Sequence, residues 1–216
     1  MRMLFRPTNW NVVVLGEWNV AIFTPEWIGK NVFGLAEGTP ISVEVPINVR
    51  APWRIKHQNV AVMASTGRIE FSCDSPTYAT LDVARGFART SLTELPRTPV
   101  SAAGFNLRFQ SGQTPPELAE AISGGVDEAL ADAAYRIAGR ATRRSLEFQD
   151  GLINCEIAMD GDETARITLN FHRGSIDPEE LKRWLSIPIA EVEGHSARIL
   201  STLKGVTYEG DHEQDI

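Results

Sequence analysis

The sequence predicts an α+β fold in which antiparallel sheets carry helices packed on one face, arranged as two sub-domains of similar size. Apolar side chains recur at three- and four-residue spacing over residues 76–94, which indicates an amphipathic helix. Asp150-Gly151 separates two apolar runs, and this dipeptide is a strong hairpin signal. Each half of the chain places its strands before its main helix, an order typical of α+β layering.

The composition is that of a globular protein. The chain has 216 residues, of which 43% are hydrophobic and 23% are charged, so it can bury a sizeable core. An apolar run of only three residues precedes Arg6, too short for a secretory signal, and no window approaches the roughly eighteen apolar residues of a membrane helix. Arginines outnumber lysines seventeen to four, which favours a bacterial source. We expect a cytoplasmic protein without a membrane segment.

A polar, turn-rich segment at 110–116 predicts the boundary between the two sub-domains. The N-terminal sub-domain, residues 1–112, would hold a tryptophan-rich sheet and the helix over 76–94. The C-terminal sub-domain, residues 113–216, would hold short helices, a three-stranded meander and helices within 178–203.

In the first half, residues 9–23 are predicted to form one long strand, because alternation makes one of its faces almost wholly apolar. Thr24 and Pro25 indicate the start of a short helix, which Gly34 would end. The remaining elements predicted here are an edge strand over 41–49, a hairpin of 60–64 and 68–73, the helix over 76–94 and a strand over 100–109.

The second half is predicted to begin with helices. Residues 114–117 have the form of a capping box that opens a short helix, and a Gly-Gly pair separates it from a second helix over 126–138. The elements that follow are strands over 142–149, 152–159 and 164–172 and helices over 178–185 and 189–203.

Tryptophans are concentrated in the first quarter of the chain, where polar residues such as Asn19 accompany them. An aromatic ring offers a large contact area at low entropic cost, so Trp10, Trp18, Asn19 and Trp27 are candidate residues for binding a protein partner or a second copy of the chain. A core sheet packed against the helix over 76–94 accounts for the same rings. The leading prediction is a non-enzymatic interaction or accessory protein, chaperone-like, that binds through its N-terminal sheet.

Four arginines form the densest basic run: Arg136, Arg140, Arg143 and Arg144. Arg136 and Arg140 would share one face of a helix, so the run is a candidate anion site, and phosphate or nucleic-acid binding is an alternative function. The formal net charge of −7 opposes binding to nucleic acid. Cations at the C-terminal end of a solvated helix account for the same residues.

An enzyme acting on a small polar substrate, with a histidine as general base, is the other alternative function. The chain lacks the glycine-rich nucleotide motifs, the GxSxG elbow, HExxH and paired CxxC. Its four histidines are His57, His172, His195 and His212, and Glu191 would share a helical face with His195. An ion pair on an ordinary helix accounts for that last pair.

Cys73 and Cys155 each lie within a predicted strand and lack a nearby second cysteine, so we expect two buried, reduced thiols. Asp160, Asp162 and Glu163 offer oxygen atoms to a cation, but the spacing is not that of a calcium loop, and solvated acidic turns are common. The sequence therefore predicts neither a metal site nor a cofactor.

Overall fold

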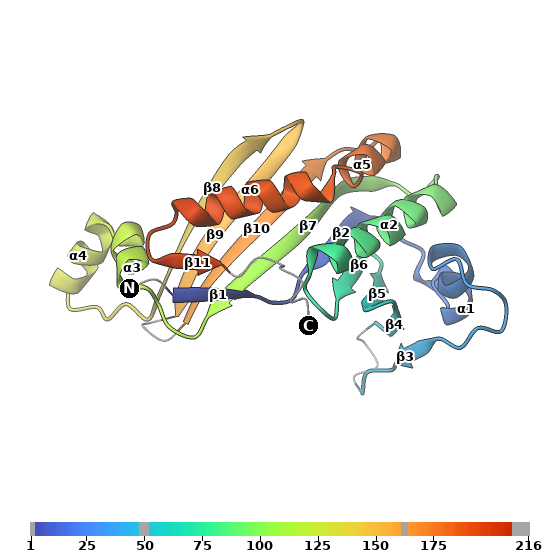
Figure 1. Ribbon diagram of the computed structural model, residues 1–216, viewed down its shortest axis with the longest axis horizontal. Helices are drawn as coiled ribbons and strands as arrows, with labels where there is room; N and C mark the ends of the chain where they lie inside the picture. Colours follow the sequence, from blue (N-terminus) through green and yellow to red (C-terminus); the bar gives the residue numbers. More distant parts are fainter. Residues whose placement is uncertain (1–2, 48–51, 161–163, 209–216) are drawn as a thin grey trace, which may run out of the picture.

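The computed structural model describes residues 3–47, 52–160 and 164–208. It contains six α-helices and eleven strands in one sheet, in which the order β3-β4-β5-β6-β2-β7-β10-β9-β8 is antiparallel throughout (Figure 1). β1 pairs with β7 and, in parallel, with β11. The predicted mixed α+β class is confirmed. The strands are β1 (Met3–Pro7), β2 (Asn11–Gly16), β3 (Ser42–Glu44), β4 (Arg54–His57), β5 (Val60–Ser65), β6 (Arg68–Cys73), β7 (Val100–Ser111), β8 (Gly139–Phe148), β9 (Gly151–Asp160), β10 (Thr164–Gly174) and β11 (Val206–Tyr208).

Three helices make the main contacts with the sheet. α2 (Tyr78–Glu94) begins where the Thr77 side chain accepts from Thr80 N, and it contacts β2 and β6. α5 (Pro178–Trp184) contacts β7 and β10, and α6 (Ile189–Thr202) contacts α2 and β11. The amphipathic helices predicted over 76–94 and 189–203 are therefore present.

The remaining helices are short. Thr24 caps α1 (Pro25–Trp27), which continues as the π-helical turn η2 (Ile28–Val32). α3 (Pro116–Ile122) and α4 (Gly125–Asp132) precede β8. No helix within the described ranges is long and apolar enough to cross a membrane.

The core lies on the side of the sheet that α2 and α5 contact. Alternate residues of β7 and β10 are fully buried there, and the rings of Phe105 and Phe171 stack with their centroids 4.9 Å apart. The ring of Trp184 of α5 lies 6.4 Å from that of Phe105 and 5.8 Å from that of Phe148. The opposite set of alternate residues is polar over residues 106–110 of β7 and 164–172 of β10.

Two predictions of strand extent need correction, and three strands were not predicted. The segment 9–23 is not one strand, because β2 ends at Gly16, where the register with β7 shifts and a Cβ would lie 2.6 Å from Pro99 O. The chain then turns into the 3₁₀-helix η1 (Val20–Ile22). Among the described residues 41–47, the strand predicted over 41–49 forms only β3, and β1, β4 and β11 were not predicted.

The predicted boundary at 110–116 does not interrupt the sheet. β7 extends to Ser111 and pairs with β2 from the first half of the chain and with β10 from the second half. Both halves thus contribute strands to one sheet, and their division into sub-domains 1–112 and 113–216 stays a prediction.

Candidate functional site

Four asparagines lie side by side across the sheet. Asn11, Asn106, Asn170 and Asn154 come from the adjacent strands β2, β7, β10 and β9, and the register places each directly opposite the next. We call these four residues the asparagine row. They occupy the alternate positions, so they lie on the sheet face opposite to the core rings of Phe105 and Phe171.

The asparagine row is a continuous chain of side-chain hydrogen bonds. Asn154 Nδ2 donates to Asn170 Oδ1 at 3.1 Å, Asn170 Nδ2 to Asn106 Oδ1 at 2.8 Å, and Asn106 Nδ2 to Asn11 Oδ1 at 2.7 Å. At the β8 end, Ser145 Oγ donates to Asn154 Oδ1 at 2.7 Å. Six strands from β8 to β6 are thereby linked by side chains as well as by their backbones.

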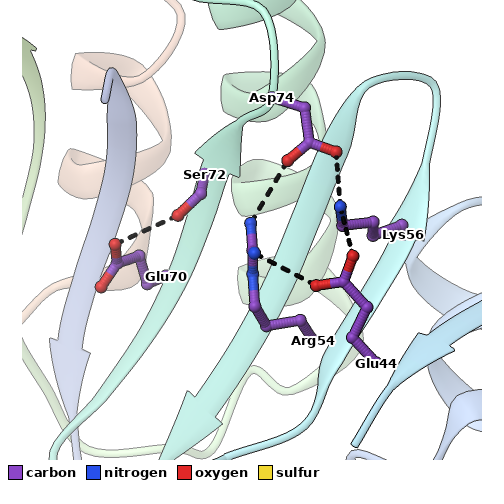
Figure 2. A network of polar contacts seen from close by, with 6 residues as sticks. All are labelled: Glu44, Arg54, Lys56, Glu70, Ser72 and Asp74. Atoms are coloured by element: carbon purple, nitrogen blue, oxygen red, sulfur yellow. Dashed lines mark hydrogen bonds and ion pairs between the residues drawn. The ribbon is translucent and has the colours of Figure 1, made fainter. Parts of the chain in front are cut away.

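Glu70 fixes the direction in which the hydrogen bonds of the asparagine row run. Asn11 Nδ2 donates to Glu70 Oε1 at 2.7 Å, and Ser72 Oγ donates to the same oxygen at 3.2 Å, as Figure 2 shows for Ser72. An ionised carboxylate only accepts, so Asn11 must present its NH₂ group to Glu70, and every amide behind it is oriented in turn. Each amide keeps one N–H and one oxygen lone pair for other partners.

A polar pocket of about 560 Å³ adjoins the Glu70 end of the asparagine row. Its lining combines the amides of Asn11 and Asn106 with charged side chains from β4, β6 and β7. The charged and hydroxyl residues at the pocket include Arg54, Arg68, Glu70, Ser72, Asp74 and Arg108.

Most of the charges at this pocket are neutralised in place. Arg54 and Lys56 both lie between Glu44 and Asp74, and four ion pairs of 2.6–3.2 Å close the ring (Figure 2). The hydrogen bonds that Lys56 Nζ donates to Glu44 and Asp74 raise the pKa of Lys56. Since two cations face two anions, this ring anchors the strands β3 and β4 without adding net charge.

Arg108 is the cation at the pocket that no carboxylate neutralises within the described ranges. Its Nη1 donates to Asn9 O at 2.6 Å, and Asn9 adopts a left-handed φ of 52°. A guanidinium has five N–H donors in a planar fork, so most of its donors stay available to a ligand. The pocket therefore combines one uncompensated positive charge with two amides that have spare donors.

The tryptophans predicted to bind a partner are mostly internal. Trp10 and Trp18 are only 1% and 3% exposed, and Trp10 Nε1 donates to Arg108 O at 3.0 Å. Both rings are thus part of the core, which is the alternative that the sequence analysis also allowed. Trp27 is half-buried, with its ring 5.4 Å from that of Phe23, and the Asn19 side chain caps η1 by accepting from Ala21 N.

The arginine run does not form the predicted helical stripe. α4 ends at Asp132, Arg136 lies in the connection, and β8 begins at Gly139, so Arg140 and Arg144 lie on one face of a strand and Arg143 on the other. Arg140 Nε also donates to Asp127 Oδ2 at 2.5 Å, which neutralises its charge.

His57, His172 and His195 lie on three different elements, β4, β10 and α6. His57 packs against the rings of Phe33 and Phe87, and His195 packs against Phe148, 4.7 Å away. His172 is on β10, where burial and then the charge of Arg143 lower its pKa. His212 lies outside the described residues.

The acidic side chains and thiols named in the sequence analysis do not come together at one site in the described ranges. Glu191 accepts a hydrogen bond from Gln149 Nε2 at 2.8 Å. Cys73 and Cys155 are buried free thiols, as predicted. No group of three His, Cys, Asp or Glu side chains is arranged to hold a metal in the part of the chain that the structure describes, and Asp162 and Glu163 lie outside it.

The asparagine row was not predicted, although the sequence carries a signal for it. Asn106 lies between Phe105 and Leu107, and Asn170 between Leu169 and Phe171. Asparagine is depleted in strands, so its repeated occurrence between apolar strand residues indicates a special role. Comparison with protein-family models and with curated proteins finds no match, so the function rests on this geometry.

Proposed function

We propose that this chain is a non-enzymatic interaction protein of the bacterial cytoplasm, an accessory or chaperone-like component that binds a partner on the polar face of its sheet. In this proposal α2, α5 and α6 cover one face, and the face with the asparagine row is the binding surface. The observation that carries it is Arg108, an uncompensated cation beside Asn11 and Asn106 in a polar pocket. The N-terminal strands remain the binding region, with polar groups in place of the buried tryptophans.

The chemistry of the pocket favours a carboxylate. Arginine binds a carboxylate through two parallel N–H donors, and the spare N–H groups of neighbouring amides can satisfy its remaining lone pairs. Glu70 and Asp74 line the same pocket and would repel a ligand with several negative charges. A single carboxylate fits better than a polyphosphate, which agrees with a chain whose net charge is −7.

Two sources supply such a group: an acidic side chain of a protein partner or a free organic acid. The test titrates labelled protein with acetate, with succinate and with a five-residue peptide, Gly-Gly-Asp-Gly-Gly, while following the side-chain N–H signals of Arg108 and Asn106. We expect saturable shifts of these signals. Tighter binding of the peptide than of succinate supports a protein partner, and the reverse order supports a metabolite.

Two variants make the titration specific. Arg108→Gln should abolish the saturable shifts, because it removes the charge and keeps a polar side chain of similar reach. Arg97→Gln removes the same charge at an exposed position after α2, outside the pocket, and should leave the titration unchanged. Signals of Arg108 and Asn106 that stay constant with all three compounds would rule the proposal out.

A further inference from the structure

β8 is a long strand with a free edge. Within the described ranges its one strand neighbour is β9, and it lies at the end of the sheet opposite to β3 (Figure 1). α3 contacts β8, and the ion pair from Asp127 of α4 reaches Arg140 near its start. The five residues 143–147 are all exposed. An open edge of this length is a template for pairing with another strand.

Backbone hydrogen bonds elsewhere in the sheet show in which direction the backbone groups of β8 point. Bonded and non-bonded residue pairs alternate along an antiparallel ladder. Between β2 and β6, Gly16 N donates to Gly67 O at 3.1 Å, and Cys73 N donates to Trp10 O at 2.9 Å. The alternation between these two bonds leaves the pair of Asn11 with Ser72 non-bonded, so the backbone N–H and C=O of Asn11 point to β7.

The same alternation can be followed along the asparagine row to β8. Asn11 is bonded to Asn106, the pair of Asn106 with Asn170 is non-bonded, and Asn170 is bonded to Asn154. The backbone N–H and C=O of Asn154 therefore point away from β8. The backbone N–H and C=O of Ser145, opposite Asn154, point outward from the sheet. Alternate residues share this direction, so the free edge presents the backbone groups of Arg143, Ser145 and Glu147.

These three residues are self-complementary under two-fold symmetry. When two β8 strands pair antiparallel about Ser145, Arg143 of each copy lies opposite Glu147 of the other, on the same face as the asparagine row. Neither side chain forms an ion pair within the described part of its own chain. Pairing about Arg143 or about Arg144 would instead place two arginines opposite each other, which is unfavourable.

We infer that two copies of this chain associate through β8, antiparallel and centred on Ser145. Roughly six backbone hydrogen bonds would form across the three outward-facing pairs. The charges that normally protect a sheet edge disfavour the registers centred on Arg143 and Arg144 and permit this one. The two asparagine rows would meet at the Ser145 pair, making one polar surface across both copies. This inference depends on β8 alone and not on the carboxylate pocket.

Charge exchange tests the register. Sedimentation velocity of the full chain over a hundredfold concentration range should show a monomer–dimer equilibrium. Arg143→Glu or Glu147→Arg should weaken dimerisation at least tenfold, because like charges then face each other. The double variant with both substitutions should restore it. Arg166→Glu, on the same face but on β10, controls for net charge and should leave dimerisation unchanged.

A cross-link keeps the test independent of charge. Paired Cα atoms in a bonded antiparallel pair lie about 5.5 Å apart, within the range of a disulfide. Ser145→Cys should therefore form a covalent dimer on mild oxidation, whereas Arg143→Cys, which would face Glu147 of the other copy, should not. A monomer at every concentration, or single and double charge variants that dimerise equally, would overturn the inference.

Discussion

Asn106 donates a hydrogen bond from Nδ2 to Oδ1 of Asn11 at 2.7 Å, although the two residues are 95 positions apart in the sequence. The bond joins the central strand β7 to β2 on the face opposite to the core. Each amide depends on its neighbour, so the contribution of one asparagine to stability should depend on whether the next is present.

The first prediction concerns this dependence. Asn106→Leu should lower the free energy of unfolding by about 1–3 kcal/mol, because it leaves Oδ1 of Asn11 and Nδ2 of Asn170 without their partners in the row. Thr168→Val on β10 is the matched control and should cost less than about 0.5 kcal/mol. Urea unfolding of both variants and of Asn106→Leu combined with Asn170→Leu completes the cycle. If the row is coupled, the loss of unfolding free energy in the double variant should be smaller than the sum of the two single losses, by at least about 0.5 kcal/mol. A double loss equal to that sum would contradict a coupled row.

The second prediction concerns Trp18. Because its ring is buried beside Phe23, Trp18→Ala should cost about 3–5 kcal/mol of stability. Trp53→Ala is the control, since Trp53 is half exposed, and should cost about 1 kcal/mol at most. Thermal melts measure both changes. An unchanged melt for Trp18→Ala together with a loss of mass in sedimentation would instead make the ring an interface anchor.

Cys73 provides a prediction at alkaline pH. Burial, followed by the charge of Asp74, raises its pKa to about 12, whereas an unfolded cysteine titrates near about 8.5. The folded state therefore holds the proton longer, and stability should fall as pH rises above about 8.5, by about 1 kcal/mol between pH 7 and 9.5. Denaturant unfolding at several pH values should show this slope, and Cys73→Ala should flatten it. Burial also raises the pKa of Cys155, so part of the slope should persist.

His172 provides a prediction of opposite direction at acid pH. Burial and then Arg143 lower its pKa, so the folded state binds its proton less readily than the unfolded chain does. Stability should fall as pH drops below about 6.5. His172→Gln should reduce the loss between pH 7 and 5, and Thr168→Val on the same strand should keep it. Equal losses in all three proteins would show that His172 does not contribute.

Local periodicity made much of the fold predictable. The apolar spacing of α2 and the hairpin signal at Asp150-Gly151 are encoded within a few residues, and both the helix and the hairpin are present, although the turn itself is formed by Gln149 and Asp150 and Gly151 begins β9. The end of β2 was missed because it depends on the close approach of Pro99 to Gly16, more than eighty positions away. The arginine run was assigned to the wrong element because a helix over 126–138 was extended past its end at Asp132.

The candidate site was beyond sequence reasoning for a different reason. The asparagine row exists only once β2, β7, β10 and β9 have been placed side by side in one register, and strand order is a property of the whole sheet. Composition could flag Asn106 and Asn170 as unusual strand residues, but not as neighbours. Arg108 likewise becomes distinctive only when the carboxylates around it are known.

The uniform orientation of the asparagine row gives the sheet an electrical polarity that sheets ordinarily lack. Strand dipoles alternate and largely cancel, but here four side-chain amides all direct their N–H groups toward β6. Their dipoles add across the strands, with the positive end at Glu70 and the negative end at β8. Glu70 thus holds the position that a bound anion occupies at the N-terminus of a helix, and a sheet face acquires a transverse counterpart of the helix macrodipole.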